Sequence, residues 1–468
     1  MTTQLDYNPG RRNPYVDLIK DQKFALISAL PLDSGPVLEK VEIAYKTWGV
    51  LNEKRDNAIV ICHALSGSSD ISDWWEPLLR PGKTFDYTRY FVFCGNLLGS
   101  PYGSASPLTT NPKTGEPYGP EFPETSIRDD VRAHKLVLDA LGVQTVAAVI
   151  GGSMGGMAAL EWPLCTPPGY VNTIIPIATS ADHSAWGISW AETQKQCIYA
   201  DANYQDGYYD ISHPPTAGLA AARMIAMLTY RSCVSFDRRF GRKFNPKKNA
   251  PKATTNGAGG NPEKLVNGDK PANDEEPMNC VGQDPKCDAF RSAKRARVEA
   301  TIGAAESVHR ARSPMFSAQG YLNYQGEKFI KRFDANCYIN LTNKMDSHDV
   351  TDGRLDHERE PTGEDFKEVL KAAPPRALVV SVNTDALFEP DQQVRLAEYL
   401  PDATLATLDS PDGHDGFLLA FEELDKIITE RLRERCPWVY EGPPLLEVNR
   451  NGSTAVKDSV FGEVESEW

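Results

Sequence analysis

The sequence contains no apolar run that approaches the roughly 20 residues needed for a membrane-spanning helix. Residues 1–21 are polar and lack the apolar core of a secretory signal peptide. Basic residues are outnumbered by acidic ones: the chain has 50 Lys and Arg and 64 Asp and Glu, which gives a net charge of −14. We therefore expect a protein that binds neither membranes nor nucleic acids.

The nine cysteines form no pattern typical of a disulfide framework or a metal site. Their number is odd, so they cannot all pair within one chain, and no spacing matches a zinc site. Cys62 and Cys94 lie in apolar segments, where a free thiol behaves as a small apolar side chain. These features predict free thiols, no bound metal and a reducing compartment, most simply the cytoplasm.

Short apolar runs alternate with segments of helical periodicity, which favours an α/β fold with a mostly parallel sheet. The composition, 41% hydrophobic and 24% charged, is ordinary for a globular protein. The expected strands are 41–47, 58–62, 90–96, 146–150, 171–178, 377–382 and 403–408. The expected helices include 127–141, 157–162, 217–230 and 416–435.

The most informative segment is Gly-Gly-Ser-Met-Gly-Gly at residues 151–156. It directly follows one expected strand and precedes an expected helix. Strand, Gly-x-Ser-x-Gly turn and helix together form the nucleophile elbow of enzymes with the α/β-hydrolase fold. The turn holds the Ser153 hydroxyl at its apex, and the glycines allow neighbouring backbone to approach closely. The sequence therefore predicts this fold, with helices on both faces of the sheet.

A long insertion interrupts the alternation of strands and helices. About two hundred residues separate the expected strands 171–178 and 377–382, which is too many for a simple connection. We expect residues 1–182 and 365–468 to form the hydrolase core and residues 183–364 to form a helical lid. Within the lid, residues 237–313 are rich in Lys, Asn, Pro and Gly and predict a disordered surface loop.

A serine nucleophile needs a histidine base, and the histidine needs a carboxylate that orients it. In this fold the acid follows a late strand and the histidine follows the last one. Asp385 and His414 meet these conditions, so we predict Ser153, Asp385 and His414 as the catalytic triad. The alternatives are a plain turn serine, an aspartate that caps a turn and a structural histidine.

The oxyanion of the tetrahedral intermediate needs N–H donors aimed at it. We expect one from the amide of Met154, which follows the nucleophile. The other is expected from His-Ala-Leu-Ser-Gly at residues 63–67, the loop after strand 58–62, and we choose Leu65. His63 is better explained as a residue that packs this loop than as a base.

Longer segments carry a more specific signal than the elbow. They are 44–49 (Ala-Tyr-Lys-Thr-Trp-Gly), 62–67 (Cys-His-Ala-Leu-Ser-Gly), 96–100 (Asn-Leu-Leu-Gly-Ser), 127–130 (Ile-Arg-Asp-Asp), 151–157, 222–224 (Ala-Arg-Met), 228–231 (Leu-Thr-Tyr-Arg), 332–336 (Arg-Phe-Asp-Ala-Asn), 345–349 (Met-Asp-Ser-His-Asp) and 413–415 (Gly-His-Asp). Together the chain resembles the fungal type of homoserine O-acetyltransferase. Two positions differ: Ser66 stands where the family often has Thr, and Asn383-Thr384-Asp385 replaces the commoner Ser-Asp.

The resemblance implies a ping-pong reaction of methionine biosynthesis. Acetyl-CoA, a co-substrate rather than a bound cofactor, acetylates Ser153, and the hydroxyl of L-homoserine then takes the acetyl group. Arg223 would hold the homoserine carboxylate, Asp415 would pair with its amino group, and Tyr230 would line the same pocket. For Arg223 and Asp415 an ordinary ion pair is the alternative. The family is often dimeric, which suggests a homodimer.

Other functions remain open from the residues alone. Serine O-acetyltransferases, homoserine O-succinyltransferases and deacetylcephalosporin acetyltransferases resemble the chain in fold and triad. A simple esterase would pass the acyl group to water, whereas a transferase must exclude water, which agrees with a large lid. A binding protein that has lost catalysis is the remaining alternative, and the intact Ser153, Asp385 and His414 argue against it.

Overall fold

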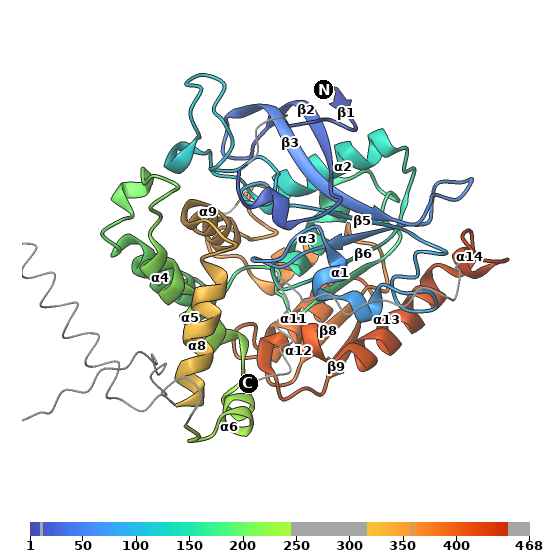
Figure 1. Cartoon of the computed structure of the whole chain (residues 1–468). Helices are drawn as coiled ribbons and strands as arrows, with labels where there is room; N and C mark the ends of the chain where they lie inside the picture. The colour runs from blue at the N-terminus through green and yellow to red at the C-terminus, as the bar shows by residue number, and fades with distance from the viewer. Residues whose placement is uncertain (10–12, 245–315, 357–358, 448–468) are drawn as a thin grey trace, which may run out of the picture. The chain divides into compact units, whose positions relative to one another are not determined.

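The computed structural model describes residues 1–9, 13–244, 316–356 and 359–447. Within these residues it contains one nine-stranded sheet in the order β1-β2-β3-β5-β4-β6-β7-β8-β9 (Figure 1). The strands are β1 (Thr3–Gln4), β2 (Lys23–Pro31), β3 (Val37–Trp48), β4 (Ala58–Cys62), β5 (Phe91–Gly95), β6 (Val146–Gly152), β7 (Ile174–Ile177), β8 (Leu378–Val382) and β9 (Thr404–Leu408).

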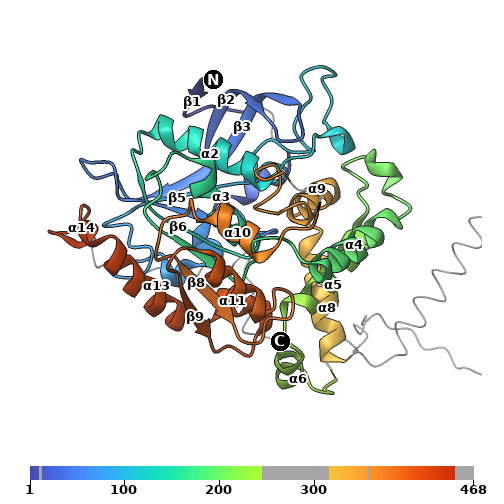
Figure 2. The same cartoon turned by 180° about the vertical axis from the view of Figure 1, so that it is seen from behind.

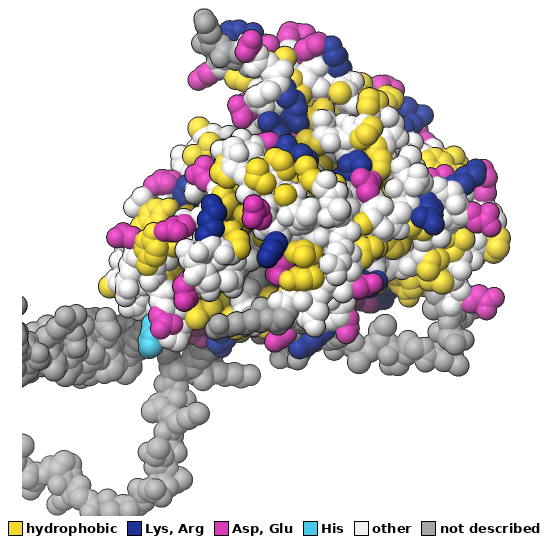
Figure 3. All heavy atoms as spheres, turned by 90° about the horizontal axis from the view of Figure 1, so that it is seen from above, with side chains coloured by type: hydrophobic (Ala, Val, Ile, Leu, Met, Phe, Trp, Pro, Cys, Tyr) yellow, Lys and Arg dark blue, Asp and Glu magenta, His cyan; other side chains and the backbone are white. Residues whose placement is uncertain are grey.

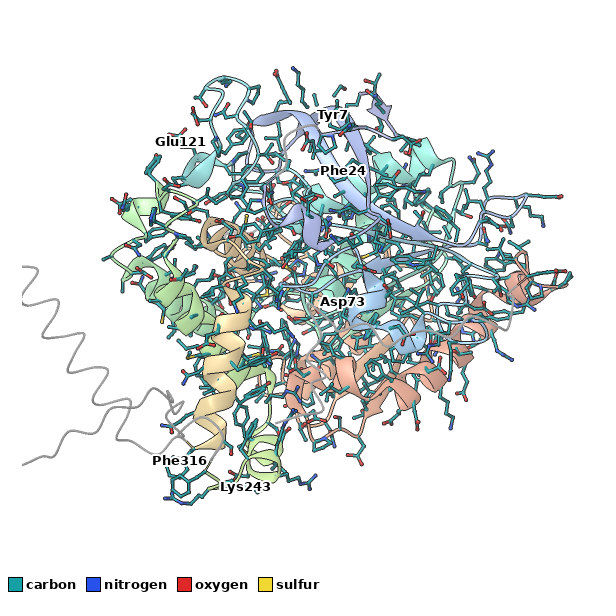
Figure 4. The ribbon with its side chains drawn as sticks, in the orientation of Figure 1. Tyr7, Phe24, Asp73, Glu121, Lys243 and Phe316 are labelled. Carbon is teal, nitrogen blue, oxygen red and sulfur yellow. The ribbon has the colours of Figure 1, made fainter. Side chains whose placement is uncertain are left out.

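Six strands, from β5 to β9 in the sheet order, pair in parallel, and β1, β2 and β3 add an antiparallel edge. The prediction of a mostly parallel sheet is therefore confirmed. The antiparallel strands β1 and β2 were not among the expected ones. Near them, Tyr7 packs on Phe24, Val16 and Ala44, and Figure 4 labels Tyr7 and Phe24 at this edge.

Helices follow most of the parallel strands, as the alternating pattern predicted. They are α1 (Ile71–Trp74), α2 (Ile127–Leu141), α3 (Met154–Cys165), α4 (Ala185–Tyr199), α5 (Thr216–Tyr230), α6 (Cys233–Arg239), α8 (Ser317–Phe329), α9 (Ala335–Asp346), α10 (Gly363–Leu370), α11 (Pro390–Tyr399), α12 (Gly416–Leu419), α13 (Phe421–Arg435) and α14 (Pro437–Tyr440). The expected helix 416–435 is thus two helices, because Ala420 has ψ of 54° and breaks the helical path.

Alternate residues of the central strands pack into separate cores on the two faces of the sheet, as the two-residue period of a strand requires. In β4, Ala58 and Val60 pack with α2, α3, α10 and α11, which lie over the near face in Figure 2. Ile59 and Ile61 pack with α1 and α13 on the other face. Helices therefore cover both faces, as predicted.

The chain divides into two compact units, residues 1–239 with 321–468, and residues 240–320. In the second unit, Phe244 and Phe316 form an isolated β-bridge with ring centroids 4.5 Å apart, and Figure 4 labels Phe316 and Lys243. The expected loop 237–313 lies outside the described residues from residue 245 onward, and its first three residues complete α6. The boundaries of the core and the lid stay predictions.

Two further findings concern the described part of the chain. No helix there is long and apolar enough to span a membrane. The seven cysteines within it are all free thiols: Cys62, Cys94, Cys165, Cys197, Cys233, Cys337 and Cys436.

A buried ion pair joins helix α9 to the hydrolase core. Lys344 of α9 and Asp130 of α2 lie 2.6 Å apart, and both side chains are almost fully buried. The same groups hold the loop after β5, since the Lys344 ammonium donates to the Leu98 carbonyl and the Asp130 carboxylate accepts from the Leu98 amide. Burial raises the pKa of Asp130 to about 6 and lowers that of Lys344, while the attraction within the pair opposes both shifts.

We expect Lys344→Met to lower the free energy of unfolding by about 3–5 kcal/mol, because it leaves the Asp130 carboxylate buried without its cation. The double variant Asp130→Asn/Lys344→Met should cost less, since no unpaired charge remains buried. Urea unfolding followed by circular dichroism measures both, with exposed Lys331→Met as the control. Equal losses in the single and double variants would contradict this account.

Candidate active site

Ser153 lies at the junction of β6 and α3, at the carboxyl edge of the parallel strands. Its φ of 58° and ψ of −127° form a strained turn of the kind expected at a nucleophile elbow. The Ser153 amide donates to the Ile177 carbonyl at 2.9 Å, and the Thr179 hydroxyl donates to the Ser153 carbonyl at 2.9 Å. Both hydrogen bonds come from the end of β7 and fix the turn from outside.

Close contacts with a backbone carbonyl and with a side chain explain two glycines of the elbow. A Cβ atom at Gly155 would lie 2.1 Å from the Cys62 carbonyl oxygen, and one at Gly156 would lie 2.6 Å from the side chain of Thr179. The start of α3 therefore packs directly on the end of β4, where the loop 63–67 begins.

Asp385 and His414 form the hydrogen-bonded pair expected from the sequence. His414 Nδ1 lies 2.7 Å from Asp385 Oδ2, and both side chains are buried. The other carboxylate oxygen, Oδ1, accepts from the amides of Leu387 and Phe388 at 2.9 and 3.0 Å. Burial lowers the pKa of His414, but the charges of Asp385 and Asp415 outweigh it, so the pKa lies above its ordinary 6.5.

Asn383 and Thr384, which differ from the pattern of the resembled family, link the loop that carries Asp385 to the loop that carries His414. The Thr384 hydroxyl donates to the Ser410 carbonyl at 2.6 Å and accepts from the Gly413 amide at 2.9 Å. Asn383 accepts from the Ser410 amide at 3.1 Å. The two loops that carry Asp385 and His414 are therefore held together by direct hydrogen bonds.

Three aromatic rings surround the His414 imidazole. Phe388 stacks on it with centroids 5.2 Å apart, Phe417 packs edge-on at 5.4 Å, and Tyr230 lies at 6.0 Å. Phe417 also fills the space beside Gly152, where a Cβ atom would lie 2.4 Å from the ring. The same ring thus contacts both the turn at Gly152 and the histidine, and aromatic rings pack around the imidazole.

The loop 63–67 is firmly held in the structure. His63 is 1% exposed, its Nδ1 lies 2.8 Å from the Ala64 carbonyl oxygen, and its Nε2 accepts from the Leu97 amide at 3.3 Å. Burial lowers the pKa of His63 to about 4. A neutral, fully bonded imidazole fits the packing role expected for His63. The amide of Leu65 has no hydrogen-bond acceptor among the described residues.

Arg223 and Tyr230 lie on the same helix, α5, and are close to each other. Arg223 is 1% exposed, and its guanidinium lies 5.6 Å from the centroid of Tyr230 and 5.0 Å from that of Phe329. Since the ring of Tyr230 also faces His414, α5 brings the predicted carboxylate-binding residue into the neighbourhood of the predicted base.

Asp415 forms an ion pair with a residue that sequence reasoning did not select. Its Oδ2 lies 2.9 Å from Nε of Arg231, and Arg231 also pairs with Asp412 at 3.3 Å. A Cβ atom at Gly413 would lie 2.6 Å from the Ser232 amide nitrogen, so the end of α5 rests on the histidine loop. Arg231 ends the segment Leu-Thr-Tyr-Arg at residues 228–231, and the family resemblance of this segment was the sequence feature that could have identified it.

Phe388, Phe417 and Arg332 were also not predicted as site residues. Arg332 donates to the Ser66 carbonyl in the loop 63–67 at 3.0 Å. It belongs to the segment Arg-Phe-Asp-Ala-Asn, which marked it without indicating its contact. Among the described residues no group of three His, Cys, Asp or Glu side chains is placed to hold a metal ion.

Comparison with known proteins adds independent information. A family model of the alpha/beta hydrolase fold matches residues 57–421. Proteins named homoserine O-acetyltransferase from Cryptococcus neoformans var. grubii, Emericella nidulans and Saccharomyces cerevisiae are 45%, 46% and 43% identical to this chain. The matches cover 97%, 99% and 97% of this chain and 97%, 97% and 95% of those proteins.

Solved structures agree on the fold. A homoserine O-acetyltransferase from Bacillus anthracis has a TM-score of 0.67 at 21% identity, over 89% of this chain and 98% of that one. An acetylester hydrolase from Corynebacterium glutamicum has a TM-score of 0.65 at 21% identity, over 88% and 96%. A transferase and a hydrolase thus share this architecture, so the fold by itself does not decide between the two reactions.

Proposed function

Because the chain belongs to the homoserine O-acetyltransferase family, within the alpha/beta hydrolase fold, we propose that it transfers an acetyl group from acetyl-CoA to the hydroxyl of L-homoserine. The observation that carries the choice of substrate is the similarity, over nearly the whole chain, to relatives with that name. The product would enter methionine biosynthesis.

The proposed chemistry runs in two half-reactions. Ser153 Oγ attacks the thioester carbonyl while His414 takes its proton, and the oxyanion is held by the amides of Leu65 and Met154. The intermediate collapses with release of CoA, which receives the proton from His414. The homoserine hydroxyl then attacks the acetyl-enzyme, His414 again takes the proton, and Ser153 regains it as O-acetyl-L-homoserine leaves.

The buried surroundings of His414 are compatible with acyl transfer. An acyltransferase must keep water away from the acyl-enzyme until the acceptor arrives. The rings of Phe388, Phe417 and Tyr230 pack around the imidazole. The alternative hypothesis is an esterase, and the experiment must distinguish it from the transferase.

Release of CoA thiol from acetyl-CoA, with and without L-homoserine, tests the proposal. We expect release that depends on L-homoserine. Release without an acceptor would indicate a hydrolase, and release only with L-serine would indicate a serine O-acetyltransferase. Faster turnover with succinyl-CoA than with acetyl-CoA would indicate a homoserine O-succinyltransferase.

We propose that Arg223 binds the homoserine carboxylate. Loss of a charged hydrogen bond should raise the KM for L-homoserine about 10- to 100-fold in Arg223→Ala, with the KM for acetyl-CoA changed only a few-fold. Arg223→Lys keeps the charge but not the two parallel donors, so its effect should be intermediate. Steady-state kinetics with each substrate varied measures this, and equal changes in both KM values would contradict the assignment.

The remaining expectations about partners stay predictions. On the face drawn in Figure 3, Lys and Arg side chains are interspersed with Asp and Glu. We propose small-molecule substrates, with neither a nucleic acid nor a membrane as partner. We also propose a homodimer that is located in the cytoplasm.

A further inference from the structure

The carbonyl of Ala64 accepts two hydrogen bonds from within its own loop. His63 Nδ1 lies 2.8 Å from the oxygen, and the Gly67 amide donates to it at 2.9 Å. A trans peptide bond is planar, so its C=O and N–H groups point in opposite directions. The groups that orient the Ala64 carbonyl therefore also orient the amide of Leu65, the proposed oxyanion donor.

The protonation of His63 suits this task. The Leu97 amide donates to Nε2, so Nε2 carries no proton and Nδ1 carries one. The pKa of about 4 keeps the ring neutral at physiological pH. Nδ1–H is therefore a permanent donor to the Ala64 carbonyl, and the ring is anchored at its other end by Leu97, next to the loop that Lys344 holds at Leu98.

A second anchor reaches the same loop from the segment between α8 and α9. Arg332 is 4% exposed, and its Nη1 donates to the Ser66 carbonyl at 3.0 Å. The guanidinium stacks 4.9 Å from the ring centroid of Phe329, and the Tyr102 hydroxyl donates to the Arg332 carbonyl at 2.8 Å. Arg332 is thus fixed at both its backbone and its side chain.

We propose that His63 and Arg332 are positioning residues that jointly set the direction of the Leu65 amide for acyl transfer. Nothing places either side chain on the reacting atoms; each acts through the backbone of the loop 63–67. The inference rests on the proposed function, because it assumes acylation of Ser153 with Leu65 as an oxyanion donor. It assigns a role to the segment Arg-Phe-Asp-Ala-Asn, which the substrate residues leave unexplained.

Two amide variants of His63 separate positioning from packing. In His63→Asn the amide nitrogen takes the place of Nδ1, so it keeps the donor to Ala64 and loses the acceptor for Leu97. In His63→Gln the amide takes the place of Nε2, so it keeps the contact with Leu97 and loses the donor to Ala64. Loss of an oxyanion donor costs roughly 100- to 1,000-fold in kcat.

We expect kcat to fall about 100-fold in His63→Gln and less than about 10-fold in His63→Asn, with KM values changed only a few-fold in both. Arg332→Gln should also lower kcat without raising KM, and Arg332→Lys should restore part of the loss. The His63→Gln/Arg332→Gln double variant should lose less than the product of the single losses, because both residues act on one loop.

Arg89→Gln is the matched control for Arg332. Arg89 also stacks on an aromatic ring, that of Tyr440, and donates to the backbone carbonyls of Val439 and Gly442. It lies with α14, away from α8 and α9 in both Figure 1 and Figure 2. Its loss should leave kcat unchanged.

The readout is the pre-steady-state burst of p-nitrophenol from p-nitrophenyl acetate, together with CoA release from acetyl-CoA. The ester acylates a serine nucleophile whatever the natural substrate, so a wild-type burst with the ester but not with acetyl-CoA would reject the proposed function and leave this inference testable. Equal burst rates in His63→Asn and His63→Gln, or an Arg332→Gln burst like that of Arg89→Gln, would overturn the inference.

Discussion

Ser153→Ala should abolish acyl transfer while leaving the fold intact. In the proposed mechanism no acetyl-enzyme forms without Oγ, so both half-reactions are lost and kcat should fall on the order of 10⁴- to 10⁶-fold. Stability should change little, because the two hydrogen bonds that fix the turn involve the backbone of Ser153 and not its hydroxyl. CoA release and thermal unfolding measure the two effects.

Ser180→Ala is the matched control for this variant. Ser180 is a buried serine that follows β7, the strand next to the elbow, and its hydroxyl donates to the Asp182 carbonyl. Its kcat should stay within a few-fold of the wild type. Mass spectrometry after incubation with acetyl-CoA should show an acetylated wild type and an unmodified Ser153→Ala. A folded Ser153→Ala enzyme with normal turnover would mean that another group is the nucleophile.

Local signals explain why some elements were predicted with correct bounds. Helix α2 was expected at 127–141 and has those bounds, because Ser126 and Asp129 form a capping box at its start and Gly142 ends it in the left-handed conformation. Strand β4 was likewise expected at 58–62, since it is a fully buried apolar run. Where helix caps or a continuous apolar run mark both ends of an element, the sequence is sufficient to predict its bounds.

Strand β2 shows where such signals fail. Its sequence, Lys-Phe-Ala-Leu-Ile-Ser-Ala-Leu-Pro, is rich in residues that also favour helices, and its strand conformation depends on antiparallel pairing with β3. The structure also has two helices, α12 and α13, where the sequence predicted a single helix at 416–435. The periodicity of 416–435 is continuous, but Ala420 leaves the helical path at a point that periodicity does not reveal.

The candidate site divides in the same way. The strand-by-strand order of the fold was enough to select Asp385 and His414, which the structure joins by a hydrogen bond. The contacts of Arg231 with Asp415 and of Arg332 with Ser66 span long distances in the sequence and depend on how the segments after β7 fold back. No local pattern encodes them, so only the resemblance marked these residues.

Asp385→Asn should lower kcat about 10⁴-fold, because it changes the tautomer of His414, with the imidazole proton on Nε2 instead of Nδ1. The amides of Leu387 and Phe388 both donate to Oδ1, so the asparagine must keep its oxygen there. Its NH₂ group then faces His414 Nδ1 and donates to it. The imidazole proton moves to Nε2, where the ring can no longer accept a proton from the serine.

The pH dependence gives the same variant a second readout. In the proposed mechanism neutral His414 is the base, so kcat/KM of the wild type should fall as the pH drops through the His414 pKa, which lies above 6.5. The Asp385 carboxylate stabilises the imidazolium, so its removal lowers that pKa and should move the acidic limb of the profile to lower pH.

Asp412→Asn controls for the loss of a carboxylate in the histidine loop. Asp412 lies two residues before His414, but its carboxylate contacts Arg231 and Ser235. Its pH profile should keep the wild-type limb, and its kcat should stay within a few-fold of the wild type. If Asp412→Asn loses activity as strongly as Asp385→Asn, or if Asp385→Asn turns over normally, Asp385 is not the residue that orients the base. Because a hydrogen bond of 2.7 Å joins Asp385 to His414, we expect a large loss of activity in Asp385→Asn and little loss in Asp412→Asn.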